Sequence, residues 1–119
     1  MAKTLTLTAS EQTIVNDLMV YKGEAPTLSF TMSPVVDITG WTLTMTVKRV
    51  GTDTSALVSV AGTIVSGTNG TFTVALTSTQ TKTTLGIGLF AYDVQRTNSG
   101  SETVLSVGRL VIKQESLNA

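Results

Sequence analysis

The chain has 119 residues, of which 41% are hydrophobic and 13% are charged, and its mean hydropathy is +0.27. This composition predicts one compact domain with a hydrophobic core. The formal net charge is zero, and the eight basic residues are scattered, with Lys48-Arg49 as the single adjacent pair. Binding to nucleic acid or to an anionic membrane requires clustered Lys and Arg, so we expect neither partner.

Residue types that the chain lacks exclude several kinds of chemistry. There is no histidine and no cysteine, which excludes disulfides, thiolate nucleophiles, Ser-His-Asp triads and the usual zinc sites. No two of the eight acidic residues lie within four positions of each other, and none forms a calcium-loop pattern. We therefore expect no enzyme activity, no cofactor and no metal.

Residues 1–12 are predicted to form an N-terminal arm or an edge strand. Threonines separate Leu5 from Leu7, so the apolar run of a signal peptide is missing. No stretch reaches the ~18 apolar residues of a membrane span. A weak strand is expected at residues 3–8. It either adds to the sheet of a neighbouring subunit, with Leu5 and Leu7 as partner contacts, or frays as termini commonly do.

Alternation of apolar and polar residues predicts the strands that follow. A second weak strand is expected at residues 13–21, and half-buried strands at 27–32, 41–48 and 71–76. The residues expected in the core from these strands and the later hairpin are Phe30, Trp41, Leu43, Phe72, Phe90, Tyr92 and Val94. Strands at roughly 8–12-residue spacing with turns between them are typical of an all-β sandwich or barrel.

Turn chemistry divides the strands. Asn69-Gly70 tolerates the positive φ angles of a tight hairpin turn, and residues 98–100 are expected to close another. Thr77 is followed three positions later by Gln80, as in a capping box, which predicts one helical turn near residues 78–84. Leu85 is then expected to enter the core.

The last third of the chain reads as a long closing hairpin, with strands from residue 88 and from residue 104. Its final strand has apolar residues on both faces: Val107 and Val111 on one, Leu110 and Ile112 on the other. One pair must face something other than the core, unless a bulge at the glycine between them shifts the phase. The alternatives are such a bulge, cover by the N-terminal segment, or a subunit contact, and in the last case Val107 and Val111 are the predicted partner contacts.

Two motif matches lack the context that their chemistry needs. Residues 86–91 fit Gly-x-Gly-x-x-Ala, but a dinucleotide site requires a strand before this motif and a helix after it. Here a Thr-rich turn precedes and a strand follows, so Gly88 is expected to allow close packing instead. The sequon at residues 69–71 is explained by the Asn-Gly turn.

Two groups of segments carry a resemblance to a known family. They are residues 21–24, 28–32 and 37–41 in the first half, and residues 76–80, 85–94 and 104–110 in the second. In order and spacing they resemble the immunoglobulin-like domain of the baseplate upper protein and of related small tail, fibre and head proteins of tailed bacteriophages. The resemblance spans residues 21–113.

This resemblance implies an immunoglobulin-like antiparallel β-sandwich of about seven to eight strands. The sandwich domain is expected at residues 13–115, followed by a tail at 116–119. Fibre-bearing members usually carry a long C-terminal extension, whereas this chain stops at Ala119. That difference favours an adaptor, a tail or baseplate accessory protein, or a capsid decoration protein.

The leading functional expectation is thus a non-catalytic virion structural protein, made in the host cytoplasm and not secreted. Its expected partners are other virion proteins and further copies of itself, in a homo-oligomer or a symmetric array. The alternative is a carbohydrate- or receptor-binding module, which requires an exposed aromatic or acidic cluster that the sequence does not show. A small enzyme is the third possibility, and it is disfavoured by the missing residue types.

Overall fold

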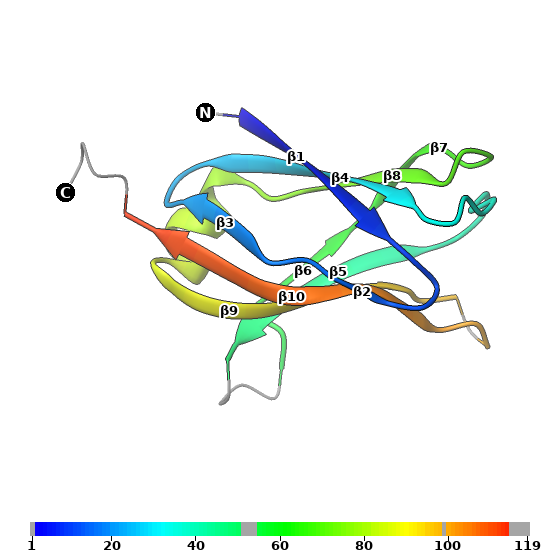
Figure 1. The fold of residues 1–119 in the computed structure, drawn as a ribbon. Helices are drawn as coiled ribbons and strands as arrows, with labels where there is room; N and C mark the ends of the chain where they lie inside the picture. Colours follow the sequence, from blue (N-terminus) through cyan, green and yellow to red (C-terminus); the bar gives the residue numbers. More distant parts are fainter. Residues whose placement is uncertain (1, 51–54, 99, 115–119) are drawn as a thin grey trace.

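The computed structural model describes residues 2–50, 55–98 and 100–114, and its strands pack in two layers (Figure 1). The strands are β1 (Ala2–Ala9), β2 (Ile14–Val15), β3 (Leu18–Tyr21), β4 (Ala25–Met32), β5 (Leu43–Arg49), β6 (Val58–Ala61), β7 (Thr63–Ser66), β8 (Thr71–Ala75), β9 (Gly88–Arg96) and β10 (Thr103–Lys113). A short π-helix, η1 (Gln80–Leu85), connects β8 to β9. The predicted all-β sandwich is confirmed.

The smaller sheet has the strand order β1-β4-β8-β7, and the larger has β2-β10-β9-β5-β6, with β3 also paired to β10. The sheets are mixed, because β1 lies parallel to β4 and both β2 and β3 lie parallel to β10. The sequence predicts an antiparallel sandwich of about seven to eight strands, whereas the described residues form ten, three of which, β1, β2 and β3, pair in parallel. The difference arises at the N-terminus, where the chain runs along an edge of the smaller sheet and then crosses to an edge of the larger one.

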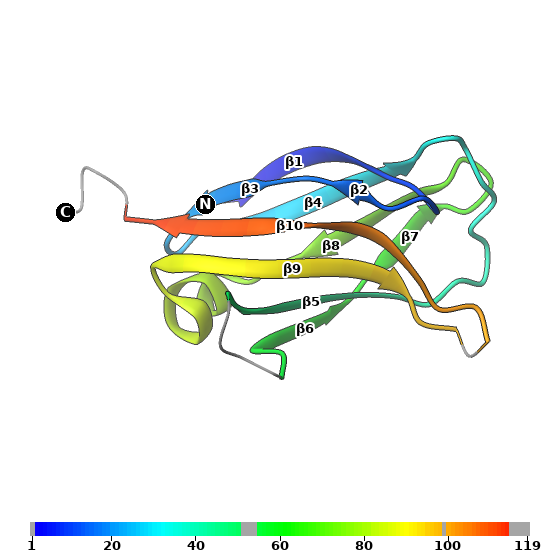
Figure 2. The same ribbon diagram turned by 60° about the horizontal axis from the view of Figure 1, so that its bottom comes forward.

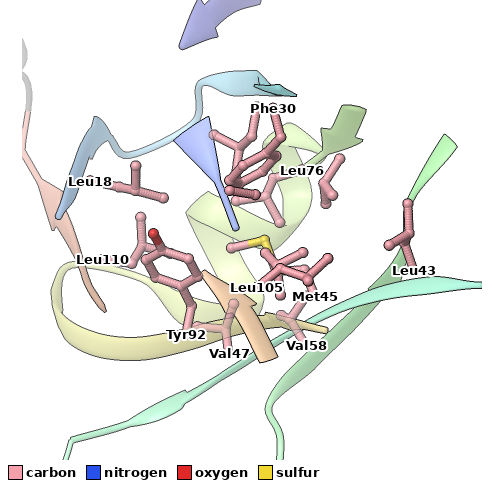
Figure 3. Packing of buried hydrophobic residues seen from close by; sticks show 14 of the residues in the cluster. Leu18, Phe30, Leu43, Met45, Val47, Val58, Leu76, Tyr92, Leu105 and Leu110 are labelled. Atoms are coloured by element: carbon pink, nitrogen blue, oxygen red, sulfur yellow. The ribbon is translucent and has the colours of Figure 1, made fainter. Parts of the chain in front are cut away.

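The core lies between the two sheets, where alternate residues of each strand point inward (Figure 3). The Phe30 and Phe72 rings stack at its centre, with 5.0 Å between their centroids. Six of the predicted core residues are confirmed as buried: Phe30, Leu43, Phe72, Phe90, Tyr92 and Val94.

The prediction for Trp41 was only partly right. The strand begins at Leu43, so Trp41 precedes it, and its half-buried ring packs against the rim of the core. The Arg96 guanidinium covers this ring at 4.3 Å from the centroid. Next to it, the Thr42 N–H donates to the Asn98 side-chain oxygen (2.7 Å), and the Thr42 carbonyl accepts from the Thr97 N–H (2.9 Å).

The predicted capping box is confirmed. The Gln80 N–H donates to the Thr77 hydroxyl oxygen (3.1 Å), and the Thr77 N–H donates to the Gln80 side-chain oxygen (2.8 Å). Leu85, at the end of η1, is buried as expected.

Both predicted hairpin turns form. Gly70 has a φ of +68°, and its N–H donates to the Gly67 carbonyl. At the β9–β10 hairpin the Ser101 N–H donates to the Asn98 carbonyl (2.9 Å), and Gly100 has a φ of +81°. The predicted turn residue Ser99 lies outside the described residues.

The pairing of β10 with β9 is irregular, but not at Gly108, where the sequence allows a bulge. The register with β9 shifts between Val104 and Ser106 instead, and both Leu105 and Ser106 are buried. Beyond this shift, Leu110 and Ile112 point into the core. Gly88, expected to allow close packing, has room for a Cβ 3.6 Å from the Phe90 ring, which is an ordinary contact.

Candidate interaction surface

The outer face of the larger sheet carries three of the seven large hydrophobic side chains that are exposed among the described residues: Val15, Met19 and Leu89. Strands β3, β10, β9 and β5 run side by side there (Figure 2). Val107 and Val111 alternate with the inward-facing residues of β10, so both lie on this outer face and are half-buried. The alternation expected from the sequence is therefore present without a bulge at Gly108.

The pairing of neighbouring strands places further apolar residues next to these two valines. Val111 stands opposite Met19 of β3 and Leu89 of β9, and Val107 stands opposite Val15 of β2. Val15 is 70% exposed, Met19 39% and Leu89 41%. We call these five residues the apolar strip: Val15, Met19, Leu89, Val107 and Val111.

Charged residues of both signs border the strip. Arg109 of β10 pairs with Ala91 of β9, which pairs with Lys48 of β5, and the Asp17 carboxylate accepts a hydrogen bond from the Arg109 N–H (3.1 Å). These residues form one row across the sheet, with Asp17 at one end and Lys48 at the other. In the neighbouring row, Asp93 stands opposite Val107 and accepts a hydrogen bond from the Thr46 hydroxyl (2.8 Å).

The outer face of the smaller sheet is different in chemistry, because it is lined by hydroxyl side chains. Register places these residues in rows across β1, β4, β8 and β7: Thr4 with Thr27, Thr6 with Ser29, Thr73 and Thr63, and Thr8 with Thr31 and Thr71. A threonine surface in water needs no partner to cover it. Of the exposed large hydrophobic side chains that lie in strands, three are on the larger sheet and one, Val65, is on the smaller.

Leu5 and Leu7, predicted as partner contacts, are removed from that surface. In β1 they stand opposite Leu28 and Phe30, and both pack against the core cluster. Their side chains point inward because β1 completes the smaller sheet of its own domain. The threonines between them take the outer face.

A polar cluster behind the strip fixes the segment between β2 and β3. The Tyr92 hydroxyl donates to the Asn16 carbonyl (2.6 Å) and lies 3.3 Å from the Ser106 hydroxyl. The Asn16 side-chain amide donates to the Thr8 carbonyl and to Ser106, both at 2.9 Å. This cluster joins β1, β9 and β10, and no sequence pattern indicates it because its members are far apart in the chain.

Replacing Tyr92 by phenylalanine is expected to lower the free energy of unfolding by about 1–2 kcal/mol, because the Asn16 carbonyl loses its donor. Burial raises the pKa of the Tyr92 hydroxyl above its ordinary value of 10.0. The unfolded chain therefore ionises first, and stability falls as pH rises from 10.0 through the higher folded pKa. Denaturant titrations at pH 8 and above 10 measure both effects. The alkaline loss should be smaller in Tyr92→Phe, and an equal loss contradicts the role of this hydroxyl.

The described part of the chain brings no group of three or more acidic side chains together as a metal site would. Within the same residues, no helix is long and apolar enough to cross a membrane.

No family model and no curated protein matches the chain. Among solved structures, it is similar to a cysteine protease inhibitor from Entamoeba histolytica, with a TM-score of 0.51 and 16% identity over 94% of this chain and 97% of that one. A copper-containing nitrite reductase from Thermus scotoductus matches 98% of this chain and 28% of its own length, with a TM-score of 0.46 and 15% identity. At these identities, the first likeness supports the β-sandwich fold alone.

Proposed function

We propose that the chain is a non-catalytic structural module of a tailed-bacteriophage virion, a capsid decoration or a tail or baseplate accessory protein that docks in symmetric copies. The bacteriophage assignment rests on the resemblance of the sequence segments described above. The observation that supports docking is the apolar strip on the larger sheet.

An apolar strip of this kind favours a contact over a bare surface. Burying a valine or leucine side chain fully is worth about 1.5–3 kcal/mol, and contiguous exposed apolar patches often mark interaction sites. The five side chains of the strip come from strands held in one sheet, so they present a preformed face. Ordering such a face on binding costs little entropy.

Labelling of purified particles with an antibody against the chain tests the virion assignment. Regularly spaced label on heads or tails supports it and also distinguishes decoration from a tail or baseplate position. Particles without the chain contradict the proposal. A glycan pull-down tests the carbohydrate-binding alternative, because a structural module should retain no glycan.

Replacing Val107 and Val111 together by serine is expected to reduce incorporation into particles at least tenfold, because tenfold corresponds to about 1.4 kcal/mol of lost apolar contact. Both side chains are only half-buried in the domain, so the fold should survive. Quantitative mass spectrometry of purified particles measures incorporation, and a thermal melt verifies folding.

The matched control is Val65→Ser, which removes a valine that is 66% exposed on β7 of the other sheet. It should leave incorporation unchanged. Equal incorporation of the double variant and the wild type would mean that the strip is not the docking surface.

A further inference from the structure

We infer that the outer face of the larger sheet, which carries the apolar strip, binds the same face of a second copy of this chain, about a two-fold axis that lies in the interface, parallel to β9 and β10 and above the line midway between them. This inference rests on the proposed function and deepens it by naming the occupant of the docking surface. The register of the strands and the order of charges across them support it.

A two-fold axis along the strands keeps each residue at its own level and exchanges β10 with β9 of the partner copy. Val111 and Leu89 stand at one level, so Val111 of each copy then faces Leu89 of the other. In the row that contains Arg109, the arginine of each copy faces Ala91 of the other copy. Alanine is a small side chain that leaves room for the arginine stem. Val107 of each copy faces Asp93 of the other, whose carboxylate keeps the Thr46 hydroxyl as its donor, so the Val111–Leu89 contact is the apolar one that forms twice.

The charges of the middle row also become complementary. Within one copy, Asp17 lies beyond β10 and Lys48 lies on β5, on opposite sides of the axis. Rotation therefore places Asp17 of each copy opposite Lys48 of the other. Packed sheets lie about 10 Å apart, a gap that a lysine and an aspartate side chain can span together. Each dimer gains two such pairs.

The other two-fold arrangement is disfavoured by the same row. An axis across the strands at the level of Arg109 brings Val111 over Val107 of the partner copy, but it also brings Arg109 over its own counterpart. Like charges facing each other in an interface are destabilising. The row therefore selects the axis along the strands, and a partner with no matching charge order fits the strip less well.

A charge exchange tests the pair in the purified protein alone, by sedimentation equilibrium over a range of concentrations. Lys48→Glu and Asp17→Lys should each weaken the dimer at least tenfold, because each change places like charges together at two positions. The double variant should return to within about threefold of the wild-type dissociation constant. An unchanged single variant, or a double variant no tighter than the singles, overturns the inference.

Asp17 also accepts the Arg109 N–H, so Asp17→Lys loses a bond within the domain. The double variant loses the same bond, and recovery of its dimer therefore reports the pair and not the fold. The matched control is Lys82→Glu, an exposed lysine of η1 that belongs to neither sheet, which should leave the dissociation constant unchanged.

The absence of cysteine allows a second, independent measurement. Val111→Cys and Leu89→Cys proteins, mixed and treated with a bismaleimide that spans about 10 Å, should crosslink to each other. Val111→Cys mixed with Val107→Cys should not, because four residues along a strand add about 13 Å. Mass spectrometry identifies the joined positions, because position 111 also lies within reach of its own counterpart across the axis. A crosslink between positions 111 and 107 without one between 111 and 89 establishes the other axis and overturns the inference.

These experiments separate the inference from the proposed function. A monomer at all concentrations that is nevertheless incorporated into particles through the strip overturns the dimer and leaves the virion role standing. A strip-mediated dimer that never occurs in particles supports the inference and contradicts the virion role.

Discussion

Replacing Gly108 by alanine is expected to lower the free energy of unfolding by about 3 kcal/mol or more, which corresponds to a fall of about 10 °C in melting temperature. The segment between β2 and β3 passes directly over this glycine. A Cβ at position 108 would collide with the Asn16 carbonyl oxygen and stand 2.7 Å from its carbonyl carbon. The obstacle is backbone, and it is fixed by the Asn16 N–H donating to the Val107 carbonyl (2.8 Å). A thermal melt followed by circular dichroism measures the loss.

Gly23→Ala separates this collision from backbone strain. Gly23 has a φ of +89°, but nothing lies within 4 Å of a Cβ built on it. Gly23→Ala should therefore lower the free energy of unfolding by only about 1–2 kcal/mol, which is the cost of a non-glycine residue in the left-handed region. If Gly108→Ala is no more destabilising than Gly23→Ala, the β2–β3 segment does not pack over β10 as described.

Replacing Phe72 by alanine is expected to cost about 3–5 kcal/mol. The ring is fully buried, and it stacks on Phe30 with an interplanar angle of 12°. The two rings belong to paired strands of the smaller sheet and fill the space toward the larger one, so truncation leaves a cavity that the sheets cannot close. Denaturant titration at pH 7 measures the change.

Thr73→Ala is the control for Phe72→Ala, because it changes the next residue of the same strand on the outer face. It should cost under about 1 kcal/mol. Equal losses in the two variants would mean that β8 does not present Phe72 to the core. Phe72→Leu should fall between them, since a branched aliphatic side chain fills part of the cavity.

The sequence predicted the regular strands well, because strict alternation of apolar and polar residues leaves one way to bury a strand in a sandwich. Residues 27–32 and 71–76 show this pattern, and Phe30 and Phe72 are buried accordingly. The turn at Asn69-Gly70 and the capping box at Thr77 and Gln80 depend on local chemistry, so they were also predictable.

The N-terminal pairing could not be predicted in the same way. Which strand pairs with which depends on contacts far apart in sequence, and residues 13–21 alternate too weakly to show that they join β10 in parallel. Their position depends on the Tyr92 hydroxyl and the Asn16 side chain, neither of which forms a motif. The parallel edge was missed for that reason.

The strip was predictable in part. Val107 and Val111 were identified because the final strand carries apolar residues on both faces. Met19 and Leu89 were not, because each has apolar neighbours and only the register shows which of them points outward. Gly108 was noticed as an interruption, yet a glycine within a strand fits a bulge or a close backbone approach equally well. The approach of Asn16 distinguishes the two.

Oxidation of the methionines tests most directly whether the strip is where copies meet. Met19 is 39% exposed in the strip, whereas Met32 and Met45 are buried in the core and serve as internal standards. Exposed thioethers oxidise to sulfoxides, which mass spectrometry counts residue by residue. Mild peroxide should oxidise Met19 readily in the dilute isolated protein and slowly in assembled particles, with Met32 and Met45 protected in both. Equal oxidation of Met19 in the two states would contradict the account.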